Sequence, residues 1–205
     1  MSDRQALAHN RIVNSHPKFH WRVRLNAAEW DALRGLCEVD DVPSRGHGLA
    51  WLELVVRGDS LAREPRTADR ALALLEPLAG DPRKLVHLAA FGLLEEFLDP
   101  WPHKLWSVAG RLIHAPDTEV AELVPAFILE SLLEHHFDLY YPLVGDAIEA
   151  GDRHMAEALN GCYILGQAEA HFDEIVDLLR RHGIEPRFGR VRADETGGGA
   201  AVDES

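Results

Sequence analysis

Apolar residues recur at spacings of three and four along most of this chain, which is the period of an α-helix with one buried face. Short turns that contain an aspartate divide these amphipathic segments into pairs. The pattern predicts four helical hairpins and a closing helix: 27–38 with 44–57, 68–78 with 83–98, 104–113 with 119–137, 143–150 with 153–168, and finally 171–182. We therefore expect an all-α fold.

The turns themselves repeat. An aspartate recurs at Asp41, Asp81, Asp117 and Asp152. Nine positions later stands a small residue, at Ala50, Ala90, Ala126 and Gly161, and it is followed by Trp51, Phe91, Phe127 and Cys162. Repeats of this length are typical of stacked helical units that cannot bury their apolar faces alone. We expect Asp81, Asp117 and Asp152 to stand at or just before a helix start and to accept hydrogen bonds from its free backbone N–H groups. We expect each small residue to allow close helix packing and each aromatic residue to fill the space between layers.

An aspartate turn, a small residue nine positions on and an apolar helix of about four turns resemble the HEAT repeat, over residues 27–168. The resemblance implies a short right-handed α-solenoid that binds another protein along the concave surface of its second helices. HEAT repeats commonly carry a basic residue about six positions after the aspartate, which joins neighbouring repeats by ion pairs. Here those positions hold His47, His87, Leu123 and Ala158. Pro125 lies inside a second helix, where we expect a kink.

Charge narrows the choice of partner. The 205 residues carry a formal charge of −13, which argues against binding to nucleic acid and favours a basic protein, although net negative charge also serves solubility. No apolar run approaches the roughly 18 residues that a membrane span needs, so no membrane association is expected. The first 25 residues have no apolar core of a secretory signal, and we expect a cytoplasmic protein.

Glutamates on the predicted second helices are the candidate partner-binding residues, with two tryptophans as candidate anchors. They are Glu95, Glu96, Glu122, Glu130, Glu134, Glu157, Trp101 and Trp106. If these side chains converge, they form an acidic groove that attracts a basic partner. The alternative is that the glutamates line solvated helix faces and the tryptophans belong to the core. The first interpretation predicts a non-catalytic scaffold, such as an immunity-like or adaptor protein.

A helical metal-dependent, non-haem iron oxidoreductase or another small-molecule biosynthetic enzyme is the competing interpretation. The chain has twelve histidines, and Glu134, His135, His171 and Glu174 are the candidate ligands. However, no histidine follows a glutamate by three positions, as it does in di-iron helical bundles. The sequence also has no Gly-rich phosphate loop, Gly-x-Ser-x-Gly elbow or Cys-x-x-Cys pair. We therefore expect no cofactor and assign no catalytic residue.

Three segments follow from these patterns. Residues 1–26 are expected to form an N-terminal arm or cap, 27–182 the HEAT-like domain, and 183–205 a flexible tail with little apolar content. Cys37 and Cys162 fall in apolar helical segments and are expected to be reduced core residues.

Overall fold

The computed structural model describes residues 24–188, and every regular element in that range is a helix. The elements are α2 (Ala27–Glu38), α3 (Val42–Val56), α4 (Asp59–Arg63), α5 (Pro65–Ala79), α6 (Lys84–Leu94), η1 (Glu95–Phe97), α7 (Pro102–Leu112), α8 (Thr118–Val124), η2 (Pro125–Leu129), α9 (Glu130–Glu149), α10 (Arg153–Gly161), η3 (Gly166–His171) and α11 (Phe172–Arg181). The all-α prediction is confirmed. No helix in the described range is both long and apolar enough to cross a membrane.

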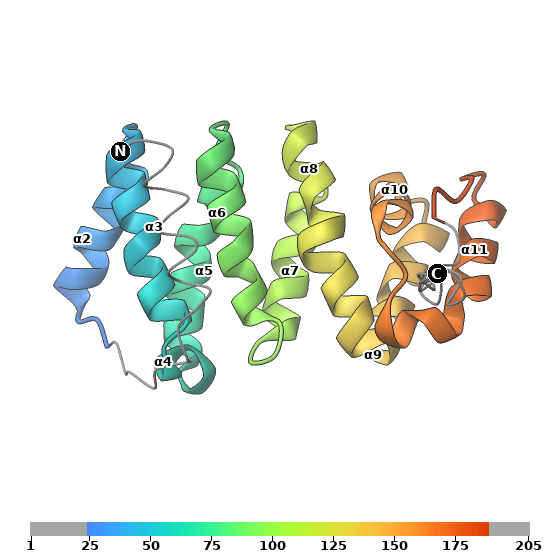
Figure 1. Ribbon diagram of the computed structural model, residues 1–205, viewed down its shortest axis with the longest axis horizontal. Helices are drawn as coiled ribbons and strands as arrows, with labels where there is room; N and C mark the ends of the chain where they lie inside the picture. Colours follow the sequence, from blue (N-terminus) through green and yellow to red (C-terminus); the bar gives the residue numbers. More distant parts are fainter. Residues whose placement is uncertain (1–23, 189–205) are drawn as a thin grey trace, which may run out of the picture.

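The helices follow one another in chain order along the longest axis of the molecule (Figure 1). α2 packs on α3 and α5 on α6, and these two hairpins join through a contact between α3 and α6. In Figure 1, α5 and α7 lie behind α6 and α8, so the second helices of successive hairpins share one layer. The first two predicted hairpins therefore agree closely with the observed helices.

The third and fourth hairpins differ from the prediction. We expected a break between residues 137 and 143, but α8, η2 and α9 follow one another without a loop from Thr118 to Glu149. The chain bends instead at His136, whose backbone is non-helical (φ −138°, ψ 39°). The amide of Phe137 donates a hydrogen bond to Gln167 Oε1 at 3.0 Å, so a side chain satisfies it at the bend. Pro125, which has no N–H to donate, begins the wide π turn of η2.

α10 is also shorter than predicted. It ends at Gly161 rather than 168, because Cys162 takes an extended conformation. Gly166 then begins η3 with φ +54°, in the left-handed region. A Cβ at Gly166 would lie 2.5 Å from Glu134 Cγ and 2.9 Å from Glu134 O, so the close approach to α9 also requires glycine.

Three of the turn aspartates are N-cap residues, because their carboxylates accept hydrogen bonds from free backbone N–H groups of the first helical turn. Asp41 accepts a hydrogen bond from Ser44 N at 3.0 Å, Asp117 from Glu119 N at 2.9 Å, and Asp152 from Met155 N at 3.1 Å. The capping prediction is thus confirmed for Asp117 and Asp152, and Asp41 caps in the same way. Asp81 stands just before the helix start and accepts a hydrogen bond from Arg83 N at 2.8 Å, although Arg83 is the N-cap residue of α6.

Asp81 joins the first two hairpins by ion pairs. It lies before the N-cap residue Arg83, and its carboxylate is fully buried. It pairs with Arg45 of the preceding hairpin and with Arg83 Nε at 2.8 Å, while Arg83 Nη1 reaches back to Asp40 at 3.0 Å. His87, at one of the expected ladder positions, bonds through Nδ1 to Asp81 O at 3.0 Å. The link between repeats therefore exists here, but Arg45 supplies it.

The recurrent small residues do not share one environment. Ala90 is fully buried, Ala50 is half-buried and Ala126 is exposed. The expected close packing is therefore absent at Ala126, and a leucine at this position should not overpack the core. Counted from the N-caps Asp41 and Arg83, the position that matches Ala90 is Gly48. A Cβ at Gly48 would lie 2.8 Å from Cys37 Sγ, so the close contact within the first hairpin is made by Gly48.

The aromatic positions diverge in the same way. Phe91 is fully buried and its ring centroid lies 5.6 Å from that of Phe127, so these two residues fill the space between the second and third hairpins as expected. Trp51, by contrast, is 51% exposed.

The packed domain extends past the predicted boundary at 182. Ile184 is buried, Phe188 packs edge-on against Phe172, and Asn160 bonds to Arg187 N and Glu185 O at 2.8 and 3.2 Å. The expectations for residues 1–23 and 189–205 lie outside the described residues. Cys37 and Cys162 are buried free thiols, and burial raises the pKa of Cys37 to about 11 and that of Cys162 well above its ordinary value.

Gly48→Ala tests the close contact within the first hairpin. The added methyl group would press on buried Cys37, and we expect the free energy of unfolding to fall by about 1–3 kcal/mol in urea titrations followed by circular dichroism. Gly145→Ala in α9 is the control, because no atom lies within 4 Å of its Cβ position. It should gain about 0.5–1 kcal/mol from helix propensity. A gain at both sites would contradict the tight contact.

Asp81→Asn tests the link between the hairpins. The substitution keeps the shape but leaves Arg45 and Arg83 without their buried anion, and we expect a loss of about 3 kcal/mol in the free energy of unfolding. Asp69→Asn removes the exposed partner of Lys104 and should change stability by less than about 1 kcal/mol. Equal losses in the two variants would show that the buried ion pairs of Asp81 stabilise the fold no more than an exposed ion pair does.

Candidate protein-binding face

The layer of second helices carries most of the predicted site residues. α6 with η1, and α8 with η2 and α9, place glutamates on neighbouring hairpins, and a contact between α6 and η2 joins these hairpins. Within the layer the structure forms two separate pairs of carboxylates. We call the four residues Glu95, Glu96, Glu130 and Glu134 the acidic face.

Glu95 and Glu96 form the first pair, in the 3-10 turn that ends α6. Glu96 is half-buried and accepts a hydrogen bond from Arg57 Nε at 3.0 Å, so its charge is partly neutralised by the preceding hairpin. Glu95 makes no ion pair with another residue of the described range. Loss of hydration, with a smaller contribution from the charge of Glu96, raises the pKa of Glu95. Glu95 is therefore the carboxylate of this pair that is left for a cation from outside.

Glu130 and Glu134 form the second pair, one turn apart at the start of α9. Glu130 accepts a hydrogen bond from Tyr163 N at 2.9 Å. Burial is the main cause that raises its pKa, the Tyr163 hydrogen bond opposes this shift, and the charge of Glu134 adds to it. Glu134 lies against Gly166, with His135 Nε2 4.0 Å from its carboxylate. Two like charges are thus held close together on a partly buried surface.

The remaining predicted residues do not join these pairs. Glu122 is exposed on α8. Glu157 is exposed on α10 and pairs with Arg153 one turn away at 3.0 Å, as on an ordinary solvated helix surface.

The two tryptophans are structural rather than exposed anchors. Trp101 is half-buried against the core, and its indole N–H donates to Leu61 O at 2.6 Å. Trp106 is also half-buried, with its ring centroid 5.5 Å from that of Tyr140. Among the large apolar side chains that the second helices do expose are Val42, Trp51 and Leu54 on α3, Leu85 on α6, and Leu139 and Leu143 on α9, with Leu85 68% exposed.

The alternative metal ligands pair with close neighbours in the sequence, Glu134 with His135 and His171 with Glu174. His171 Nδ1 lies 3.1 Å from Glu174 Oε2, and the His171 ring stacks on Phe137 with 4.2 Å between centroids. Between residues 24 and 188, no three His, Cys, Asp or Glu side chains are placed so that they could hold a metal ion.

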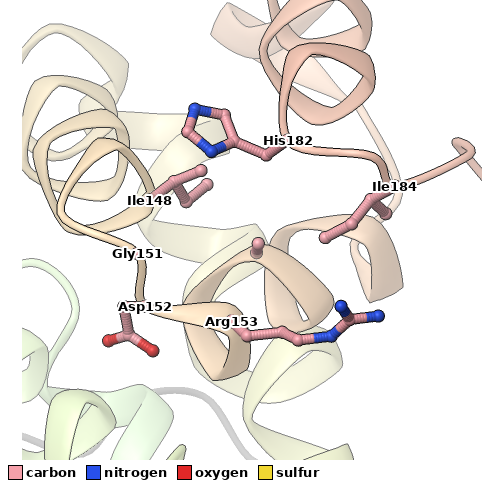
Figure 2. A pocket seen from close by; sticks show the side chains of 7 residues that line it. Ile148, Gly151, Asp152, Arg153, His182 and Ile184 are labelled. Atoms are coloured by element: carbon pink, nitrogen blue, oxygen red, sulfur yellow. The ribbon is translucent and has the colours of Figure 1, made fainter.

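A hollow of about 190 Å³ lies between α10 and the end of α11. Figure 2 shows Ile148 and Ile184 on opposite sides of this hollow, with His182 beside them. Its polar groups already have partners, because Asp152 caps α10 and lies 3.1 Å from His114 Nε2, and His182 Nε2 lies 3.2 Å from Glu149. The hollow therefore presents no uncommitted polar side chain that would orient a ligand.

One relevant residue, Arg57, was not predicted from the sequence, and another, Trp51, was assigned the wrong environment. Arg57 neutralises part of the first carboxylate pair, and its position at the end of a second helix was a usable signal because cations favour helix C-termini. Trp51 was predicted to fill a gap but is exposed, and no feature of the sequence separates it from Phe91.

Comparison with known proteins identifies no relative: no family model, curated protein or solved structure matches this chain. The HEAT resemblance therefore rests on the residues alone. What the molecule does has to be argued from its surfaces.

Glu130→Gln tests the desolvation of the second pair. The folded state holds the pKa of Glu130 above its ordinary value of 4.5, so ionisation costs stability, and that cost grows as the pH rises through the folded pKa. At pH 7 we expect urea titration to give the variant a free energy of unfolding about 0.5 kcal/mol higher than that of the wild type. This difference should vanish towards pH 4. Glu122→Gln, a substitution of an exposed residue, is the control and should leave the free energy of unfolding unchanged at both pH values.

Proposed function

We propose that the chain is a non-catalytic protein-binding scaffold whose acidic face engages a basic partner. We also propose that its hairpins form a short right-handed α-solenoid of about four HEAT-like repeats, closed by α11. Helix pairs stacked in chain order, with their second helices in one layer, support this architecture. Extended layers of this kind offer a surface to a macromolecule rather than a deep pocket to a small one.

The observation that carries the proposal is the pairing of carboxylates on two adjacent hairpins. Glu95 lacks an internal counter-ion among residues 24–188, and Glu130 and Glu134 lie one turn apart on a partly desolvated surface. Raised pKa values of Glu95 and Glu130 mean that both carboxylates are under-compensated in the free protein. A cation that approaches them gains more than it would at a fully solvated glutamate.

The partner this favours is a protein with a basic, partly apolar surface. Lysine or arginine side chains would pair with the carboxylates, and apolar groups would cover exposed leucines of the same helices, Leu85 on α6 and Leu139 and Leu143 on α9. An immunity-like protein that neutralises a basic toxin, or an adaptor, has these properties. Long-range attraction between the acidic chain and such a partner would speed association and make it sensitive to salt.

Charge reversal at the acidic face tests the proposal. Wild-type protein and a Glu95→Lys, Glu134→Lys variant would be used as bait in extracts of the source organism, and the binding of the recovered partner measured by calorimetry at several salt concentrations. We expect at least tenfold weaker binding for the variant, with a smaller salt dependence, because both attractive and steering terms are reversed.

Asp31→Lys with Glu38→Lys changes the net charge equally on exposed positions of α2 and should leave affinity nearly unchanged. If both double variants lose affinity alike, net charge rather than the acidic face governs binding. If neither does, the acidic face has no part in it.

A further inference from the structure

A second hollow lies at the opposite end of the molecule from α11, between α2 and α3. It has a volume of about 210 Å³ and is lined by Leu25, Glu29, Ala32, Leu33, Leu36 and Trp51. Five of these six residues are apolar, and Glu29 is the single charged one. We call this hollow the Trp51 groove. It shares no residue with the acidic face.

The groove lies where an end of the stack is open. Counted from the N-caps, Trp51 of α3 corresponds to Leu93 of α6. Leu93 is 5% exposed in a hairpin that has α3 beside it, whereas Trp51 is 51% exposed in a hairpin that no described element precedes. Terminal units of stacked helical proteins need a cap, because their outer apolar face is otherwise left in water.

We propose that residues 1–23 of this same chain occupy the Trp51 groove and cap the first hairpin. Leu25, which lines the groove, is separated from this segment by one residue only. Arg24 is held by an ion pair with Glu64 at 2.9 Å, so the segment enters the described domain beside the groove. Attachment at this point gives the segment a high effective concentration that a separate molecule would not have.

The composition of the segment suits the groove. Phe19 and Trp21 lie six and four residues before Leu25, within about 13–20 Å in an extended chain, and can supply aromatic rings to pack against Trp51 and the leucines of the groove. The segment carries Arg4, Arg11, Lys18 and Arg22 against Asp3 alone, in a chain whose formal charge is −13. A basic segment is therefore attracted to an otherwise strongly acidic domain.

A double-mutant cycle on the full chain tests this contact. Phe19→Ala with Trp21→Ala should lower the thermal midpoint by several degrees if these rings are buried in the groove. In a Trp51→Ala background the same pair of substitutions should cause less than half of that shift, because the contact is already lost. In a Leu139→Ala background, which removes an exposed leucine of α9, the full shift should persist.

Two outcomes would overturn the proposal. The first is a shift from Phe19→Ala and Trp21→Ala that is absent, or equal in all three backgrounds. The second is a midpoint that rises with protein concentration, together with a dimer in sedimentation equilibrium, since the occupant would then be a second copy. None of these measurements depends on a basic partner, so a failure here leaves the proposed function of the acidic face untouched.

Discussion

Lateral packing of one hairpin on the next is the interaction on which the structure depends. The first two hairpins join mainly through the contact between α3 and α6, with smaller contacts of α5 on α3 and on α2. Gly48 and Ala90 permit close packing, and Asp81, shared by Arg45 and Arg83, fixes how the two hairpins meet. A buried carboxylate with two guanidinium partners specifies this geometry, because any displacement leaves a charge unpaired away from water.

The helix period and the capping aspartates made the helices predictable, because both are local. Helix α2 was predicted with its observed bounds, and Asp117 and Asp152 cap as expected. The predicted repeat register failed where tertiary contacts decide. Asp41 is itself an N-cap residue, whereas Asp81 stands two residues before the N-cap residue Arg83. Counting from the aspartates therefore aligns Ala50 with Ala90, whereas counting from the N-caps aligns Gly48 with Ala90.

The candidate site was predictable only in part, for a similar reason. Sequence placed the glutamates on second helices, but whether they meet depends on the bend at His136 and on the return of the chain at Gly166, which brings Tyr163 N to Glu130. The sequence around Trp101 and Trp106 does not distinguish them from exposed anchors, yet the carbonyl of Leu61 and the ring of Tyr140 hold them half-buried against the core. Long-range partners of this kind leave no local pattern.

The packing of hairpins in a row also explains where exposed apolar side chains and unpaired charged side chains lie. Between hairpins, aromatic and aliphatic groups bury one another, as Phe91 and Phe127 do, and arginines such as Arg57 and Arg45 find carboxylates on the next hairpin. At the first hairpin and along the layer of second helices, no described neighbour supplies the missing packing partner or counter-ion. Trp51 therefore stays half exposed and Glu95 has no counter-ion among the described residues, so this packing leaves unmatched apolar and charged groups at these two places.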